Sequence, residues 1–316
     1  MPPVQTTLLN GTGNDISPTI QTYYDKKLLD RLIANFVHFQ FGQKRPIPRM
    51  GGKTINFRKF TSLTPTTTAL TEGTTPTGSN INITQITASP AQYGNYVEVS
   101  DVLDMVAIDP VLDEMADVLG EQAAESLDVI TRNTLVTGGT NIQFANGKTS
   151  NATVAIADVL TVTEIRKAIR TLKNGKAKPL ADGYYVAIVH PNAVYDLQGD
   201  SAWINASQYA GSTQIFQGEI GKLYGVRFVE SPNAYSFGTV GASSATVYST
   251  IIVGANAFGV VDVAGSSAVQ NIIKPHGSAG TADPLNQRAT TGWKAMFTAV
   301  VLEQAAMVQI RHSASA

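Results

Sequence analysis

The chain has four histidines that could serve as general bases or metal ligands, namely His38, His190, His276 and His312. They are far apart, and none has a second histidine at the spacing that places two metal ligands on one helix face. His190 stands before Pro191 at the expected end of a strand, where a lone histidine is more often structural than catalytic. The chain contains no cysteine, which excludes disulfides and thiolate metal sites. These residues indicate no catalytic group, no metal site and no cofactor.

Two Gly-Lys-Thr triplets resemble part of a phosphate-binding loop. That motif needs a further glycine five residues earlier, but Ile47 and Ile142 stand at those positions. We therefore interpret both triplets as ordinary turns. No glycine-rich dinucleotide motif follows a strand, and no Gly-x-Ser-x-Gly elbow is present. If the protein is an enzyme, the alternative is a cytoplasmic α/β enzyme with a site near His190.

The charged residues form two blocks of opposite sign. Six cations and no acid lie between Lys44 and Lys59, whereas ten acids and no cation lie between Glu98 and Asp128. We predict that these blocks meet between copies of the chain. In the alternative arrangement, they face opposite sides of an assembly and never touch. The residues proposed for this intersubunit contact are Arg49, Lys53, Arg58 and Lys59 on one side and Asp113, Asp117, Glu121 and Glu125 on the other.

The acidic block lies on a segment that predicts one long helix over residues 109–137. Asp109 is a good N-cap and Pro110 suits the first helical position. Apolar residues recur every three or four positions, Val111, Val118 and Val129 widen that stripe, and Gly138 and Gly139 follow directly. At 1.5 Å per residue this helix is roughly 40 Å long. A helix of this length needs a sheet or another subunit along its buried face.

The basic block leads into a segment with strand periodicity. Alternating residues predict strands over residues 54–60, 80–84 and 96–100. Residues 61–77 between them hold nine threonines, two prolines and one glycine, which is typical of an extended tip. A hairpin this long has too little core to be stable alone. We therefore expect residues 51–99 to lie mostly outside the core of their own subunit and to pack on another copy.

The other segments predict a mixed α and β chain. Residues 1–16 read as a flexible arm, and helices are expected over residues 17–41, 158–174 and from Pro191 to about 197. Cations make residues 158–178 the most basic surface of the second half. Strands are expected over residues 184–189, 226–230, 247–253, 258–263, 271–274, 290–298 and 307–311. Strands from both ends of the chain around one long helix suggest a discontinuous domain, with about 155–265 inserted as a second one.

The composition favours a surface with few charges. Only 15% of the 316 residues are charged and the net charge is −1, whereas about 25% is usual. Either a turn-rich β structure or extensive cover by neighbouring subunits explains this composition. The first ten residues lack the pattern of a signal peptide, and no uninterrupted apolar run is long enough for a membrane helix. We therefore expect a protein made in a cytoplasm-like compartment and not bound to a membrane.

Six stretches in this order resemble the major capsid protein of tailed bacteriophages along nearly the whole chain. They are YDKKLL at 24–29, FGQKRPIP at 41–48 followed by GGKT at 51–54, YGNYVEVSD at 93–101, HP at 190–191, GEIGKLYGVRFVES at 218–231 and GWK at 292–294. Another phage structural part, such as a tail or tube protein, is a second alternative.

The resemblance implies an α+β capsid fold with four parts. These are an N-terminal arm (1–45), an extended β-hairpin loop (46–100), a peripheral domain (101–154 and 266–316) with the spine helix 109–137, and an inserted axial α/β domain (155–265). It implies a structural, non-enzymatic subunit that assembles in the host cytoplasm into hexamers and pentamers of an icosahedral virion capsid. Implied partners are further copies, a separate scaffolding protein, a portal, decoration proteins and double-stranded DNA bound without sequence specificity.

Overall fold

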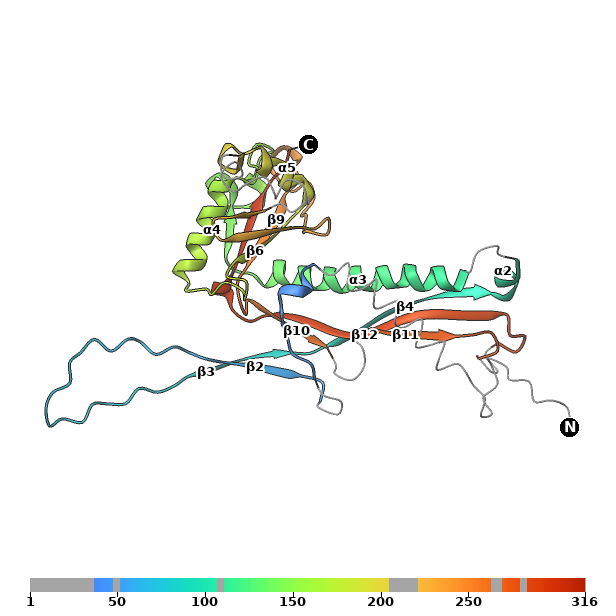
Figure 1. Cartoon of the computed structure of the whole chain (residues 1–316), viewed down its shortest axis with the longest axis horizontal. Helices are drawn as coiled ribbons and strands as arrows, with labels where there is room; N and C mark the ends of the chain where they lie inside the picture. Colours follow the sequence, from blue (N-terminus) through green and yellow to red (C-terminus); the bar gives the residue numbers. More distant parts are fainter. Residues whose placement is uncertain are drawn as a thin grey trace.

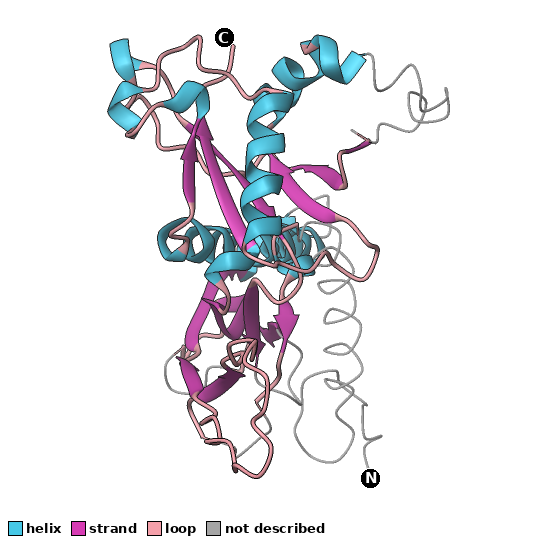
Figure 2. Ribbon diagram, turned by 90° about the vertical axis from the view of Figure 1, so that its left-hand side faces the viewer, coloured by secondary structure: helices cyan, strands magenta, loops and turns pink. Residues whose placement is uncertain are grey.

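The computed structural model describes residues 37–47, 52–106, 111–204, 221–262, 269–278 and 283–315. These residues form a lobe with a six-stranded sheet, an arm with a five-stranded sheet, and a two-stranded hairpin. Figure 1 shows that the arm and the hairpin extend in opposite directions from the foot of the lobe. The view in Figure 2 places strands above and below the level of the long helix. The molecule is therefore elongated, with most of its length outside the lobe.

Helix α3 (Val111–Gly138) has 28 residues and lies along the five-stranded sheet. Leu119, Ala123 and Leu127 are fully buried against strand residues such as Trp293 and Phe297. The predicted start at Asp109 lies outside the described residues. Val118, which was expected to widen the buried stripe, is instead 59% exposed, because Ala124 and Asp128 extend that stripe on the other side.

The five-stranded sheet has the order β1-β10-β12-β11, and β4 also pairs with β12. Strand β12 is its 14-residue centre and pairs with β4 from Arg288 to Phe297. The strands are β1 (Gln43–Lys44), β4 (Ala91–Ser100), β10 (Phe258–Asp262), β11 (Val269–Lys274) and β12 (Arg288–Val301). Helix α2 (Asp101–Val106), which the sequence pattern did not predict, follows β4 directly.

The six-stranded sheet has the order β5-β13-β9-β6-β8-β7. Its strands are β5 (Ile142–Phe144), β6 (Tyr185–Val189), β7 (Lys222–Leu223), β8 (Val226–Glu230), β9 (Tyr248–Val253) and β13 (Met307–His312). Helices α4 (Val162–Asn174) and α5 (Pro191–Gly199) share one apolar cluster with a face of this sheet. The other face joins the cluster that contains α3.

The two sheets divide the chain differently from the expected boundaries at 154 and 266. Strands β5 and β13, expected with the long helix, belong to the six-stranded sheet, and β10, expected in the inserted segment, belongs to the five-stranded sheet. The cause is that the chain crosses between sheets at two tight connections. One is residues 254–257 between β9 and β10, and the other is the 3₁₀ turn Gln304–Ala306 before β13.

Two expected helices differ from the structure. Helix α4 begins at Val162 and not at 158, because Thr161 is its N-cap, while the Asp158 carboxylate accepts hydrogen bonds from the Ala155 N–H and the Asn146 amide. Near the N-terminus, the helix expected to run to Phe41 is only a 3₁₀ turn over Phe39–Phe41 within the described residues. The earlier part of that prediction lies outside them.

The hairpin consists of β2 (Ile55–Phe60) and β3 (Ile83–Ala88), which pair in antiparallel register. Residues 58–85 are all exposed, as the threonine-rich composition predicted. At the root, Ala88, Ile47 and Val261 form a small buried cluster. Strand β4, which was expected in the extended loop, belongs instead to the five-stranded sheet, because Pro90 separates it from β3 and β12 offers it ten paired positions.

Candidate assembly surfaces

The hairpin carries large apolar side chains that its own subunit does not cover. Phe60 is 65% exposed and Leu70 is 75% exposed, and Leu63, Ile81 and Ile83 are each more than half exposed. An isolated two-stranded hairpin is marginally stable, and apolar groups gathered on an exposed element usually mark a contact surface. Figure 1 shows the tip of this hairpin far from both sheets. These exposed apolar side chains make the hairpin a candidate contact surface.

The root of the hairpin is fixed to its own subunit by both packing and charge. A Cβ placed on Gly259 would meet the Phe57 ring at 2.8 Å, so only glycine at this position of β10 allows the ring to lie so close. The Lys59 ammonium forms an ion pair with the Glu303 carboxylate of the same chain. The sequence pattern did not predict this partner for Lys59. The other hairpin cations, Lys53 and Arg58, are exposed, and Arg49 lies outside the described residues.

The acidic residues of α3 are divided between two environments. Glu121 and Glu125 are exposed and Asp117 is half-buried, while the side chain of Asp113 lies outside the described part. Asp128 is fully buried. The predicted acidic face of α3 is therefore present in its middle turns, but it is shorter than the run of acids in the sequence. The hairpin projects away from this face within one copy, so contact between the tip and α3 requires two copies (Figure 1).

Asp128 anchors the segment before β1 to α3. One carboxylate oxygen accepts the backbone N–H groups of Val37 at 3.1 Å and His38 at 2.8 Å, and the other lies 2.8 Å from His38 Nδ1. Both side chains are fully buried. Sequence reasoning missed this pair. The only signal was the position of Asp128 on the buried stripe, between Ala124 and Thr131.

His190 caps α5, as a structural histidine would. Its Nδ1 accepts the Asn192 N–H at 3.2 Å, and its ring packs on Tyr248 with centroids 4.6 Å apart. Burial lowers the pKa of His190, so it is neutral near pH 7. The Nδ1 atom of His190 is therefore occupied by a hydrogen bond from the first turn of α5. This contact indicates a structural role for His190 and not that of a general base.

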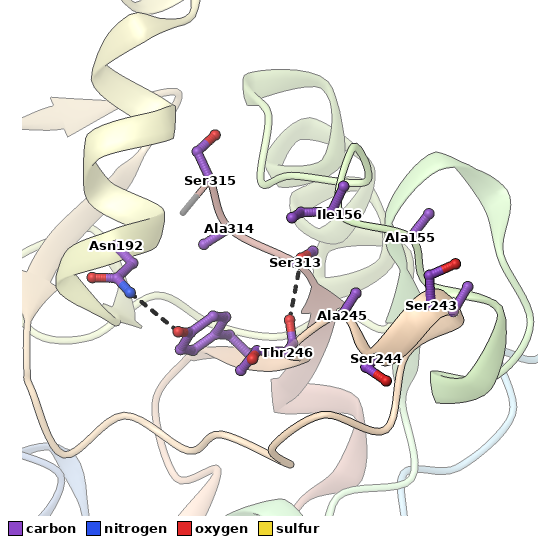
Figure 3. Close-up of a pocket in the computed structure, with 12 residues that line it drawn as sticks. Ala155, Ile156, Asn192, Ser243, Ser244, Ala245, Thr246, Ser313, Ala314 and Ser315 are labelled. Atoms are coloured by element: carbon purple, nitrogen blue, oxygen red, sulfur yellow. Dashed lines mark hydrogen bonds between the residues drawn. The ribbon is translucent and has the colours of Figure 1, made fainter.

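A pocket of about 310 Å³ lies beyond α5 at the end of the lobe. Figure 3 shows Asn192 donating to the Tyr248 hydroxyl and Ser313 donating to the Thr246 carbonyl, at 3.1 and 3.2 Å. Apart from Asn192, Tyr248 and the aliphatic Ile156, the described lining residues are alanines, serines and a threonine. Such groups can bind a small polar partner, but they include no carboxylate, cation or histidine.

The described residues contain no cluster of three histidine or acidic side chains that could hold a metal ion. His312, in the same lobe, is fully buried between the Thr250 hydroxyl at Nε2 and the Ser313 carbonyl at Nδ1. Burial lowers the pKa of His312 to about 4. Among the helices of the described part, none combines the length and apolar character needed to cross a membrane.

Comparison with known proteins identifies a protein family that matches this chain. The family model described as "Phage capsid protein" matches residues 83–310, which is most of the chain. No relative was found among curated protein sequences.

Several solved structures share the fold. The capsid of Ralstonia phage GP4 has a TM-score of 0.69 at 15% identity, covering 87% of this chain and 88% of that one. The cyanophage Pam1 capsid has a TM-score of 0.67 at 18% identity, covering 90% and 92%. An encapsulin complex from Synechococcus elongatus has a TM-score of 0.57 at 8% identity, covering 87% and 86%. At these identities the likeness establishes the fold.

Proposed function

This chain belongs to the phage capsid protein family, and from this premise we propose that its copies join as hexamers and pentamers of an icosahedral shell around double-stranded DNA. It is a structural subunit of the virion capsid and not an enzyme. The observation that supports the proposed assembly best is the hairpin, whose exposed apolar side chains have no cover within one copy.

The parts of the fold suggest roles in this shell. Residues 1–45 would be the N-terminal arm, and the β2–β3 hairpin would be the extended loop within residues 46–100. The five-stranded sheet with α3 would form the peripheral domain, and the six-stranded lobe would form the axial domain. We keep the proposed boundaries of the peripheral domain near 101–154 and 266–316, and those of the axial domain near 155–265. The exceptions are strands β5, β10 and β13, which pair in the sheet on the other side of a boundary.

The charged blocks suggest how a neighbour is oriented. The hairpin cations, Lys53 and Arg58 among them, would lie over the acidic face of a neighbour's α3, with Asp113 and Asp117. Glu121 and Glu125, which the sequence also assigned to this contact, lie in the next turns of α3 towards the lobe, and Lys59 is paired with Glu303 of its own chain. Each exposed pair would contribute about 0 to 1 kcal/mol, but a closed shell repeats every contact. Replacing Arg58 by Glu should hinder assembly at low salt, and adding Asp117→Lys should partly restore it. Equal assembly by the single and double variants would contradict this contact.

The other proposed partners are proteins that take part in building a phage capsid. A separate scaffolding protein, a portal and decoration proteins would join the copies during assembly in the host cytoplasm. The packaged DNA would be enclosed without sequence-specific contacts, since the net charge of the chain is −1.

Electron microscopy of the purified full chain tests the proposal directly. We expect rings or closed shells of uniform diameter, which elute in the void volume of a gel-filtration column. A small soluble oligomer that never forms rings or shells, at any protein concentration or in the presence of a crowding agent, would contradict it.

A further inference from the structure

A groove on the six-stranded lobe is lined by cations that no carboxylate neutralises within the described part of the chain. It has a volume of about 340 Å³ and lies between α4 and the β7–β8 turn. Its lining residues are Arg166, Ile169, Arg170, Lys173, Asn174 and Tyr224. Arg166, Arg170 and Lys173 are spaced by four and three residues, so they share the exposed face of α4.

The arrangement of charge on α4 is costly for an isolated subunit. Like charges four residues apart destabilise a helix, and Arg166 and Arg170 have this spacing. Lys167, in contrast, has its own partner, because its ammonium lies 2.7 Å from a carboxylate oxygen of Glu164. Among the described residues, the three groove cations have no carboxylate partner of this kind.

Tyr224 provides an independent sign that the groove receives a ligand. It occupies the first position of the two-residue turn between β7 and β8, with φ of 50°, followed by Gly225 with φ of 82°. Turns of this kind favour Asn or Gly at that position, so a tyrosine there strains the backbone. Its ring is nevertheless 51% exposed, and the Arg166 guanidinium lies 5.4 Å from the ring centroid. The turn thus presents an aromatic hydroxyl beside an arginine, which together suit a carboxylate.

We infer that this groove binds the exposed carboxylates Glu121 and Glu125 on α3 of a second copy. The two glutamates are four residues apart on one helix, as Arg166 and Arg170 are on α4, so the two pairs can meet one to one. This inference rests on the proposed assembly into rings. In a ring, each copy presents one surface to the next copy's different surface at a similar distance from the axis.

The shape of the subunit agrees with such a pairing. Figure 1 shows α4 on one edge of the lobe and α3 leaving the foot of the lobe on the opposite side. The two helices of one copy therefore lie on opposite sides of the lobe. Glu121 and Glu125 lie nearer to the lobe than Asp113 and Asp117 do, since α3 joins the lobe at its C-terminal end. The hairpin of a neighbour would cover the far turns of α3, and its α4 would contact the middle turns.

Two full-length variants with reversed charge test this contact. One carries Arg166→Glu and Arg170→Glu, and the other carries Glu121→Arg and Glu125→Arg. Each variant alone would place like charges against each other, so we expect about a tenfold higher protein concentration for assembly at low salt. An equimolar mixture should form hexameric rings at a lower protein concentration than either variant alone, because copies that alternate around a hexamer pair every groove with an opposite charge, whereas a pentamer keeps one like-charge contact. The measurement is sedimentation, with circular dichroism to show that each variant is folded.

A matched control separates this contact from a general effect of charge. Lys274→Glu with Lys294→Glu makes the same change in net charge at two exposed positions of the five-stranded sheet. This control should not restore assembly when it is mixed with the Glu121→Arg, Glu125→Arg variant.

Three results would overturn the inference. The first is wild-type assembly by the groove variant, and the second is a mixture that assembles no better than its components. The third is binding of a short DNA duplex by the wild type that the groove variant alone loses, with normal assembly of the α3 variant, because the groove would then bind nucleic acid. If the wild type itself forms no rings, the proposed function fails together with the inference.

Discussion

Single residues in this protein gain their roles from burial. Asp128 and His38 are both fully buried, and the carboxylate holds two backbone N–H groups as well as the imidazole. Buried polar groups of this kind stabilise a fold only while every partner is present, since an unpaired group in the interior keeps its full desolvation cost. The pair therefore fixes the path of the chain before β1 across α3.

Asp128→Ala should lower the free energy of unfolding by about 3 to 5 kcal/mol, because three hydrogen bonds lose their acceptor inside the protein. Urea denaturation of the unassembled full-length subunit measures the change. Glu125→Ala, which removes an exposed carboxylate one turn earlier on the same helix, is the control and should change stability by less than about 1 kcal/mol. Equal effects of the two substitutions would show that the buried contact contributes little.

His312 should make the stability of the lobe depend on pH. Its pKa is about 4 in the folded chain and about 6.5 when unfolded, so below pH 6.5 the unfolded state binds a proton that the fold does not. Its contribution is complete above pH 6.5 and is lost as the pH falls towards 4, by about 3 kcal/mol in total. In His312→Gln the decline over this interval should be shallower. Parallel stability curves for the two proteins would contradict the assignment.

At the scale of elements, the hairpin and α3 have opposite relations to the core. Helix α3 buries one side along its described length, whereas the hairpin buries little beyond its root at Phe57 and Ala88. The hairpin can therefore change position while the sheets stay intact. This division fits an element that packs on a second copy in the proposed shell.

Deleting residues 64–77 should leave the subunit folded but impair its assembly. All of these residues are exposed, so their removal costs no buried contact within the chain. Thermal unfolding should be within a few degrees of wild type, whereas sedimentation should show loss of shells. A Gly-Ser segment of the same length in place of residues 64–77 is the control for loop length. A deletion variant that forms normal shells would show that the tip is dispensable.

The whole molecule combines few charges with a balanced total, which suits a container for a polyanion. Proteins that bind DNA tightly display dense Lys and Arg, and each phosphate contact makes the affinity depend on salt. Here acids and cations nearly cancel, at 24 and 23. We therefore expect the surface that would face packaged DNA in the proposed shell to be near neutral or acidic.

The free subunit should bind duplex DNA weakly, with an affinity that changes little between low and moderate salt. Fluorescence anisotropy of a labelled duplex measures this at several salt concentrations, and a basic DNA-binding domain serves as the positive control. Tight binding with a steep salt dependence would count against the proposed role as a container.

Elements with local signals could be predicted from the amino-acid sequence alone. The 3.6-residue period predicted α3 to within one residue of its described end at Gly138, and alternation predicted β2 closely. The strands expected over residues 226–230 and 247–253 agree with β8 and β9. The exposed hairpin tip followed from its threonines and prolines. These features depend on residues that are neighbours in the chain, so periodicity and turn chemistry are sufficient to find them.

Which distant segments of the chain meet could be seen only in the three-dimensional structure. Strand β4 is not part of the hairpin loop, because it pairs with β12, which lies about 200 residues later in the chain. Strand β5 pairs with β13 across a similar separation. The role of Asp128 depends on its contact with His38, about 90 residues earlier in the chain. The groove beside α4 depends on the position of the β7–β8 turn next to that helix. Such contacts depend on loop closure over long separations and on three-dimensional packing, which no local pattern of residues encodes.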